Sequence, residues 1–584
     1  MPKSAPRQSP LASRTATPPP PRPLVWALAL AALAAPGLAA AQAVHDGGSL
    51  LRENERGSDR NPARPPPAEP AAPAPISPSA DNGVRFTLGR FVLRGATLVP
   101  ESELQALLAP WRDRPIGFAD LQRAGDALAA EYRSRGWLAR ILVPTQDVTD
   151  GAVTLQITEA KLGSVRVESD GGPLSLQPSV IVGTLTARQK PGEPIRLDHL
   201  ERAANLLGDI PGVAAGVTLV PGRDPGTSDV VVKALDKPAR SGLVQLDNHG
   251  SRSVGEARLS AGIQFDNPRG VGDQALLHGA LTEGSAYLRA GYWHPVGYDG
   301  GRAGIAASLM QYRLLREFRA LDASGQAQTL SFYGRYPLVR GAQRNATLNA
   351  TLDLRHYRDR AGGVESDDKQ AQVLTLGVGG DHSDDHGGGG FMQWDANATL
   401  GRIDLSGNAV HEAADRAGPH TAGRFGKVTF NLARLQRLQP ATTLWMSFSG
   451  QLGGKNLDSS EQFSLGGPNG VRAYPTLEGQ GDSGLLATLE LRHQVSRSLQ
   501  LTAFFDAGQV QRRDNPNYAG AATPNDIELK GWGIGAHWNE PGRYAIRMSL
   551  ARRIGSNPGA LPSGADSDGS LRRTRVWVAG IVYF

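Results

Sequence analysis

Two residues of opposite charge stand out as a pair that could form one specific contact. Arg472 is the only cation in a glycine- and proline-rich stretch, residues 466–484. Asp506 is the only acid in the apolar run from Phe504 to Gly508. The guanidinium presents a rigid fork of N–H donors that matches a carboxylate. We therefore expect Arg472 to pair with Asp506 as a lock between a loop and a wall.

The stretch around Arg472 is predicted to be a long loop between two strands. Its Gly and Pro content breaks both helix and strand, whereas residues 442–454 and 483–494 alternate apolar and polar residues as strands do. Such a loop in a strand array is usually functional or disordered. We expect residues 455–482 to fold back inside a barrel. The alternative is a surface loop in which Arg472 is solvated.

Residues 239–584 alternate in this way throughout, in segments of roughly ten residues separated by turn residues. Leu348, Leu352 and Leu354 share one face of such a segment, and Asp353 lies on the other. In a bilayer the apolar face meets lipid and the polar face lines a wet lumen. A soluble repetitive β-structure is the alternative.

About sixteen such segments can be counted, and sixteen antiparallel strands can close without a free edge. They begin near Leu243, Glu256, Gln274, Ala286, Ala303, Gln328, Ala346, Gln370, Gly390, Gly423, Thr442, Ser483, Leu499, Ile527, Tyr544 and Arg573. This order places Arg472 in the sixth outer loop and Asp506 on the thirteenth strand. The fold class predicted is a transmembrane β-barrel.

Composition limits the other function classes. The 584 residues include no Cys, which excludes disulfides and thiolate metal sites. The net charge of +6 is spread along the chain, which does not favour nucleic acid as a partner. No GxSxG, HExxH or P-loop pattern occurs, so we predict no enzyme, no cofactor and no metal. Residues 381–386 hold two His and three Asp but are interpreted as a solvated turn.

The N-terminal region is predicted to direct export. Residues 1–43 have a basic start, an apolar core and small residues at their end, which is typical of a signal peptide. Past residue 43 no apolar run of 18 residues occurs. Residues 44–58 contain a short polar helix with Ser49 as the expected N-cap. Residues 59–83 form a Pro/Ala-rich linker, and the alternative is a disordered tail.

Two similar units follow, residues 84–160 and 161–238. Each has the predicted order strand, helix, helix, strand, strand, which indicates an internal repeat. Each would be a small sheet backed by helices. An open sheet edge can accept an extended chain through backbone hydrogen bonds. We therefore expect the two modules to receive an unfolded polypeptide, although they could also be spacers.

The two motifs resemble the VRGY loop motif and the FxDxG wall motif of the two-partner secretion transporters, the TpsB family of haemolysin and filamentous haemagglutinin secretion-activation proteins. The residues concerned are Val471, Arg472, Ala473 and Tyr474 in the loop and Phe504, Asp506 and Gly508 in the wall. Ala473 stands where the family has Gly, and Ala resists positive φ. The element order of the two modules resembles POTRA domains.

The resemblance implies an outer-membrane protein that passes an unfolded exoprotein of the TpsA type from periplasm to cell surface. It implies that the helix in residues 44–58 plugs the lumen and that both POTRA domains lie in the periplasm of a Gram-negative cell. It also implies that Phe584, which ends an apolar last strand, is the signal read by the barrel assembly machinery during insertion into lipid. The alternative within the superfamily is an outer-membrane insertase.

Overall fold

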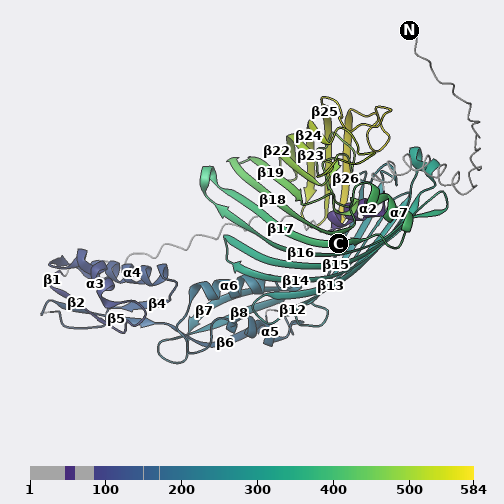
Figure 1. Cartoon of the computed structure of the whole chain (residues 1–584). Coiled ribbons are helices and arrows are strands. Elements are labelled where there is room, and N and C mark those ends of the chain that lie inside the picture. The colour runs from purple at the N-terminus through teal and green to yellow at the C-terminus, as the bar shows by residue number, and fades with distance from the viewer. Residues whose placement is uncertain (1–45, 59–84, 149, 170) are drawn as a thin grey trace, which may run out of the picture.

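The structure is a computed structural model that describes residues 46–58, 85–148, 150–169 and 171–584, with the backbone alone for 56–58. Its largest part is a closed barrel of sixteen antiparallel strands, which confirms the predicted fold class (Figure 1). The strands are β9 (Arg240–Asp247), β10 (Arg258–Asp266), β11 (Gln274–Leu281), β12 (Ser285–Val296), β13 (Gly301–Arg313), β14 (Ser324–Arg340), β15 (Arg344–Ala361), β16 (Val364–Asp384), β17 (Gly390–Asp404), β18 (Gly423–Gln439), β19 (Thr442–Gly453), β22 (Ser483–Gln494), β23 (Leu499–Gln511), β24 (Asp526–Glu540), β25 (Tyr544–Ile554) and β26 (Thr574–Tyr583).

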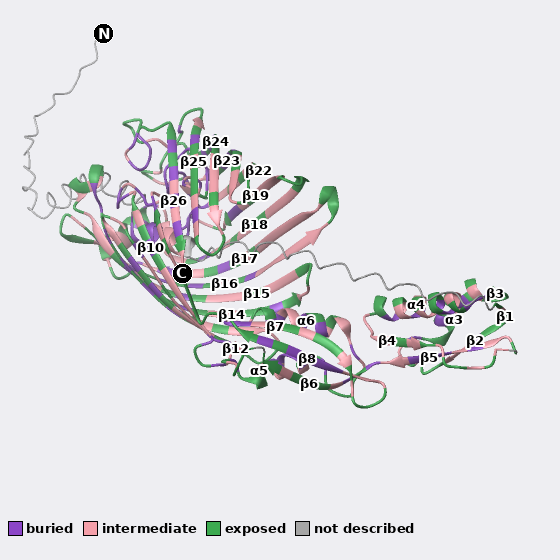
Figure 2. Ribbon diagram, turned by 180° about the vertical axis from the view of Figure 1, so that it is seen from behind, coloured by how far each residue is buried: buried purple, intermediate pink, exposed green. Residues whose placement is uncertain are grey.

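The two faces of the barrel wall differ as the alternation predicts. Leu352 and Leu354 on β15 are each 40% exposed on the outer face, whereas Asp353 between them is buried on the lumenal face. Figure 2 shows the same alternation along the other strands. The wall therefore presents apolar residues to lipid and polar residues to the lumen. Among the helices that the structure describes, none is long and apolar enough to cross a membrane.

Two small α+β modules precede the barrel, with their elements in residues 86–159 and 161–236. The first contains β1 (Phe86–Leu88), β2 (Arg90–Arg94), α3 (Glu101–Leu108), η1 (Ala109–Trp111), β3 (Arg114–Ile116), α4 (Phe118–Ser134), β4 (Ala139–Leu142) and β5 (Ala152–Glu159). The second contains β6 (Lys161–Ser169), α5 (Pro178–Thr186), α6 (Leu197–Gly208), β7 (Val213–Pro221) and β8 (Thr227–Asp236). Each has its own apolar core. The short strand β3 was not predicted, because three residues carry no readable period.

The predicted polar helix is α2 (Gly47–Ser58), and it lies inside the barrel against β13, β14 and β15. Leu50 and Leu51 are each 1% exposed and join a core formed by lumenal residues of these strands. The expected N-cap was wrong by three residues. Asp46 Oδ1 accepts from the backbone N–H of Ser49 at 3.0 Å, so Asp46 caps the helix. The predicted signal peptide and linker lie outside the described residues.

The second module is fixed to the barrel by one carboxylate. Asp299, in the turn between β12 and β13, accepts from Arg202 of α6 at 2.8 Å and from Arg188 at 2.8 Å. The hydroxyl of Tyr336 donates to it at 2.6 Å. Burial alone would raise the pKa of Asp299, but the hydrogen bonds from Arg202, Tyr336 and Arg188 outweigh burial and lower the pKa to about 2. The charged form of Asp299 therefore stabilises the docked module.

We expect this docking to weaken at low pH. A carboxylate whose pKa is lowered from 3.8 to about 2 contributes its stabilisation above pH 3.8 and loses it as the pH falls through about 2. The contribution is about 1–2 kcal/mol after allowance for solvent screening. Energy transfer between dyes on Lys190→Cys and Arg344→Cys should stay constant from pH 7 to about 4 and then fall.

The variant Asp299→Asn separates the contribution of Asp299 from that of Arg340–Asp209, a second ion pair at 2.6 Å between the module and the barrel. In this variant, energy transfer should already be reduced at pH 7 and should change less with pH. Identical pH profiles with and without the substitution would show that Asp299 does not hold the module.

Candidate functional site

A single long loop folds back into the lumen and packs against the barrel wall. Residues 454–482, here called the lumenal loop, connect β19 to β22 and include η4 (Ser459–Glu461), β20 (Phe463–Ser464) and β21 (Gln480–Gly481). β20 pairs with β21, so the loop folds on itself as a narrow hairpin. Val471, Ala473 and Tyr474 are all 0% exposed. They pack against apolar side chains of β23 and β24, so the loop lies against the barrel wall.

Arg472 and Asp506 form a bidentate ion pair in this position. Arg472 Nε donates to Asp506 Oδ2 at 2.9 Å, and Nη2 donates to Oδ1 at 2.9 Å. The backbone N–H of Arg472 also donates to Oδ2 at 3.1 Å. Asp506 is 0% exposed and receives a further hydrogen bond from Thr488 at 3.1 Å. This geometry satisfies the carboxylate completely and fixes both the loop backbone and its side chain.

Three further contacts to Arg472 were not predicted from the sequence. Glu490 on β22 lies 3.5 Å from Nη1. The guanidinium carbon lies 3.3 Å from the centroid of the Phe504 ring, a cation–π contact. Trp577 of β26 donates its indole N–H to the carbonyl of Arg472 at 2.7 Å. The alternation of strands could have indicated Phe504, which shares the lumenal face of β23 with Asp506, but neither Glu490 nor Trp577 carries a comparable signal.

The packing of the lumenal loop explains the three residues of the wall motif on β23. Phe504, Asp506 and Gly508 alternate along β23 and therefore share its lumenal face. A Cβ on Gly508 would lie 2.6 Å from Leu465 Cδ2 of the lumenal loop. The three positions thus provide a ring for the guanidinium, a carboxylate for the ion pair and space for the loop.

Ala473 causes no strain at the loop tip. Positive φ occurs in the lumenal loop at Gly467, Leu477 and Gly479, and Ala473 is not among the described residues with positive φ. The local backbone turn of this chain therefore requires no Gly at position 473. The Ala473 methyl faces Gly531 of β24, which lies directly opposite Asp506 in the register.

The substitution Gly531→Ala tests this close approach. A Cβ on Gly531 would lie 2.6 Å from the Ala473 Cβ, and neither atom is the end of a flexible chain. We expect the loop to move away from the wall at a cost of about 1–3 kcal/mol. Protease accessibility of residues 466–479 in the folded protein measures this movement. Gly580→Ala on β26 is the matched control, because a Cβ there would meet no atom within 4 Å; equal accessibility in both variants would contradict the packing.

The lumenal loop also holds α2. Lys369 of β16 is 1% exposed and lies 3.2 Å from Asp46, which caps α2, and 3.1 Å from Asp458 of the loop. A third carboxylate, Asp367, lies 3.4 Å from the same ammonium. Glu461 of the loop bridges Arg355 at 2.9 Å and Lys427 at 2.8 Å. One buried cation therefore links the barrel, the loop and the helix.

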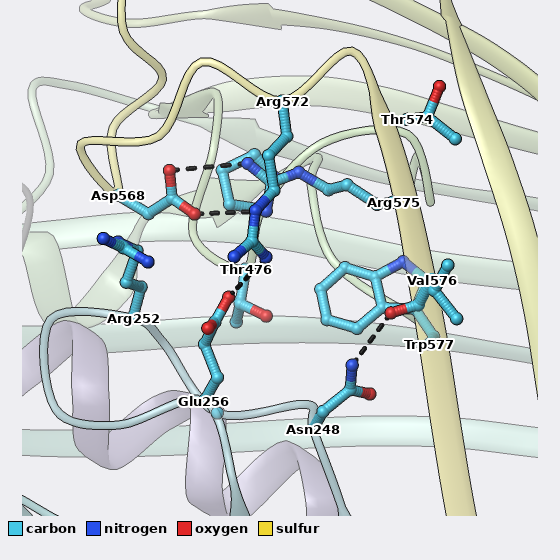
Figure 3. Close-up of a pocket in the computed structure, with 12 residues that line it drawn as sticks. Asn248, Arg252, Glu256, Thr476, Asp568, Arg572, Thr574, Arg575, Val576 and Trp577 are labelled. Atoms are coloured by element: carbon cyan, nitrogen blue, oxygen red, sulfur yellow. Dashed lines mark hydrogen bonds and ion pairs between the residues drawn. The ribbon is translucent and has the colours of Figure 1, made fainter.

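A cavity of about 320 Å³ lies beside the site, lined by the β9–β10 turn, by the lumenal loop and by residues 568–577 (Figure 3). Pro475 and Thr476, directly after the loop motif, form part of its wall. Ion pairs between Arg575 and Asp568 at 3.1 Å and between Arg572 and Glu256 at 2.9 Å flank it. These pairs connect the loops around the cavity to one another.

The structure also places the acidic turn at residues 381–386 and the C-terminal Phe584. The acidic turn at residues 381–386 ends β16, and Asp384 pairs with Arg434 at 2.8 Å. Within the described ranges, no group of three or more His, Asp or Glu residues is placed to hold a metal ion. Phe584 closes the chain beside β9, where it exchanges two backbone hydrogen bonds with Gly242 at 2.8 and 3.0 Å.

Comparisons with known proteins identify relatives along most of the chain. Residues 226–537 match the family described as haemolysin secretion/activation protein ShlB/FhaC/HecB, and residues 86–160 match the POTRA domain, ShlB-type. The heme/hemopexin transporter protein HuxB of Haemophilus influenzae is 25% identical over 526 residues, which cover 88% of this chain and 92% of HuxB. The outer membrane transporter CdiB of Escherichia coli is 24% identical over 468 residues, 77% of this chain and 75% of CdiB.

A solved structure shows the same fold. CdiB from Escherichia coli superposes with a TM-score of 0.69 at 19% identity, and the match covers 92% of this chain and 99% of that one. The likeness extends over most of the chain and shows that the two proteins share a fold.

Proposed function

Because the chain belongs to the ShlB/FhaC/HecB family of haemolysin secretion/activation proteins, we propose a transport cycle in which the contents of its lumen are displaced by the exported chain. The protein is an outer-membrane transporter that secretes a partner exoprotein, and its POTRA domains lie in the periplasm. Its lumen is occupied by α2 and the lumenal loop. A polypeptide that passes through the lumen must therefore move past these two segments or displace them.

The mechanism follows from how differently these two segments are held. The lumenal loop is fixed by a bidentate ion pair, a cation–π contact and an apolar cluster. Helix α2 is held by two leucines, by ion pairs around Lys369 and by Glu55, which lies 3.7 Å from Arg289. We infer that α2 leaves the lumen during transport and that Arg472–Asp506 keeps the loop in place beside the moving chain. This contrast is the observation that carries the proposal.

The remaining steps are proposed from general chemistry. The open edges of the POTRA sheets bind the unfolded exoprotein, of the TpsA type, by strand addition. No nucleotide is needed, because folding of the client outside buries apolar surface and prevents its return. Phe584 acts as the signal for the barrel assembly machinery, which inserts the chain into outer-membrane lipid. The chain acts as a transporter without catalytic chemistry.

A vesicle assay tests the transport function. The purified protein is inserted into lipid vesicles, and an unfolded exoprotein of the TpsA type is added on the side of the POTRA domains. We expect protease-protected, soluble client in the vesicle interior. Client left embedded in the lipid would instead indicate an insertase and would overturn the proposal.

A further inference from the structure

Two arginines lie directly opposite each other on neighbouring strands inside the barrel. Arg302 of β13 is the register partner of Arg335 of β14. Both face the lumen. Arg302 lies on the same face of β13 as the buried Met310, and Arg335 lies on the same face of β14 as the buried Ser331. Like charges at directly opposite positions destabilise a sheet. Such a pair calls for a compensating anion.

Three described carboxylates, those of Asp209, Asp266 and Asp273, lie close enough to attract Arg302, but none of them forms an ion pair with it. Neither Arg302 nor Arg335 forms an ion pair with a described carboxylate, and Arg302 Nη2 donates instead to the carbonyl of Gly272 at 3.1 Å. The nearby acids have other partners. Asp209 binds Arg340 at 2.6 Å, Asp266 accepts from Gln274 at 2.8 Å, and Asp273 accepts from the Tyr292 hydroxyl at 2.6 Å. Arg302 Nε is buried without a hydrogen-bond partner among the described residues, so the pair retains a donor that a further carboxylate could satisfy.

The position of the pair places it on the entry route. Gly272 belongs to the turn between β10 and β11, where Gly270 accepts a backbone hydrogen bond from Gln177 of the second POTRA domain at 2.9 Å. Arg302 and Arg335 thus lie on the wall immediately beyond that domain. A polypeptide that passes from the POTRA domain into the lumen meets them first.

A third arginine continues the same wall inward, and α2 already uses it. Arg289 of β12 is the register partner of Ser308 on β13. Ser308 lies six residues from Arg302 along β13, a distance of roughly 20 Å. Its guanidinium lies 3.7 Å from Glu55 of α2 and stacks over Tyr333 at 5.8 Å. The rings of Tyr333 and Trp293 lie 5.2 Å apart between the two levels. A polypeptide segment in this lumen therefore presents a carboxylate to this wall.

We propose that Arg335, Arg302 and Arg289 form a basic track that recognises acidic side chains of the exported chain. Glu55 of α2 occupies the inner end of this track at rest, and a client carboxylate replaces it when α2 leaves. The track would thus select clients whose leading segment carries Asp or Glu. This inference rests on the proposed transport function.

Peptide binding tests the track. The full-length protein in detergent micelles is titrated at low salt with a fluorescein-labelled 20-residue peptide of alternating Glu and Ser, and with its Lys/Ser counterpart. We expect the acidic peptide to bind about tenfold more tightly, because several weak ion pairs add. Arg302→Gln with Arg335→Gln should remove most of this preference, and the corresponding Lys variant should retain it.

A matched pair on the other face of the wall provides the control. Arg402 and Arg424 are also directly opposite each other, but they face outward near the outer rim. Arg402→Gln with Arg424→Gln removes the same charge and should leave the preference unchanged. Equal binding of both peptides, or equal losses in both double variants, would overturn the track. Folding of each variant is checked by heat-modifiable migration on gels.

The transport function is tested independently of this preference. If the wild-type chain secretes its exoprotein but shows no preference for the acidic peptide, the track alone is refuted. If the wild-type chain moves no client into vesicles, the proposed function fails whatever the peptides show.

Discussion

Replacement of Arg472 by Ala should reduce secretion of the exoprotein at least about tenfold while the barrel still inserts. Asp506 is fully buried and would lose its ion pair, which costs about 3–5 kcal/mol at such a site. The strands of the barrel do not depend on this pair, since their backbone hydrogen bonds remain. The loss therefore falls on the position of the lumenal loop. Secreted exoprotein in the medium, relative to folded barrel in the outer membrane, is the measurement.

Companion variants separate charge from geometry. Arg472→Lys keeps the charge but loses the fork that reaches both carboxylate oxygens, so secretion should be intermediate. The exchange Arg472→Asp with Asp506→Arg should recover little, because Phe504 and Thr488 surround the guanidinium and the carboxylate in their present places. Arg416→Ala, an exposed arginine of α7 (Ala409–Ala417), is the matched control and should secrete normally. Normal secretion by Arg472→Ala with an inserted barrel would contradict the lock.

Substitution of both Leu50 and Leu51 by Asp should release α2 and increase the conductance of the channel several-fold. Each leucine is 1% exposed, and burial of a leucine side chain contributes about 1.5–3 kcal/mol. Two carboxylates in the same apolar site would be unpaired, which adds a further cost. Single-channel recording in planar lipid bilayers measures the effect.

The control for this variant adds the same charges outside the lumen. Val410 and Leu571 are 81% and 74% exposed on outer loops, so Val410→Asp with Leu571→Asp should leave conductance unchanged. A wild-type conductance in the double variant of α2 would show that the two leucines do not retain the helix.

The sequence was most informative where a period of two residues decides the structure. Fourteen of the sixteen barrel strands begin within three residues of their predicted positions, because a strand in lipid must place apolar residues on every outward position. β14 and β16 begin four and six residues earlier than predicted. Residues 483–494 match β22 fully. The connections are less regular. The helix α7, between β17 and β18, was not predicted, since its nine residues join no periodic pattern.

The sequence also brought together Arg472 and Asp506 but not their surroundings. The pair could be predicted because each is the only charge of its sign in a distinctive stretch. Lys369 could not, since its neighbours Asp46 and Asp458 are distant in the chain and only the closed barrel brings them together. The sequence did not show which loop residues adopt left-handed backbone conformations; they are Gly467, Leu477 and Gly479, and Ala473 is not among them.

In the proposed transport cycle, the exported chain passes through the lumen that α2 occupies at rest. The sequence has no Cys, so a single engineered pair can be oxidised without side reactions. A Cβ on Gly48 would lie 2.8 Å from Ser460 Cβ, and a small shift brings Gly48→Cys and Ser460→Cys to the Cβ separation of about 3.8 Å that a disulfide needs. We predict that oxidation of this pair stops secretion and that reduction restores it. Secretion at the wild-type rate with the disulfide formed would contradict the claim.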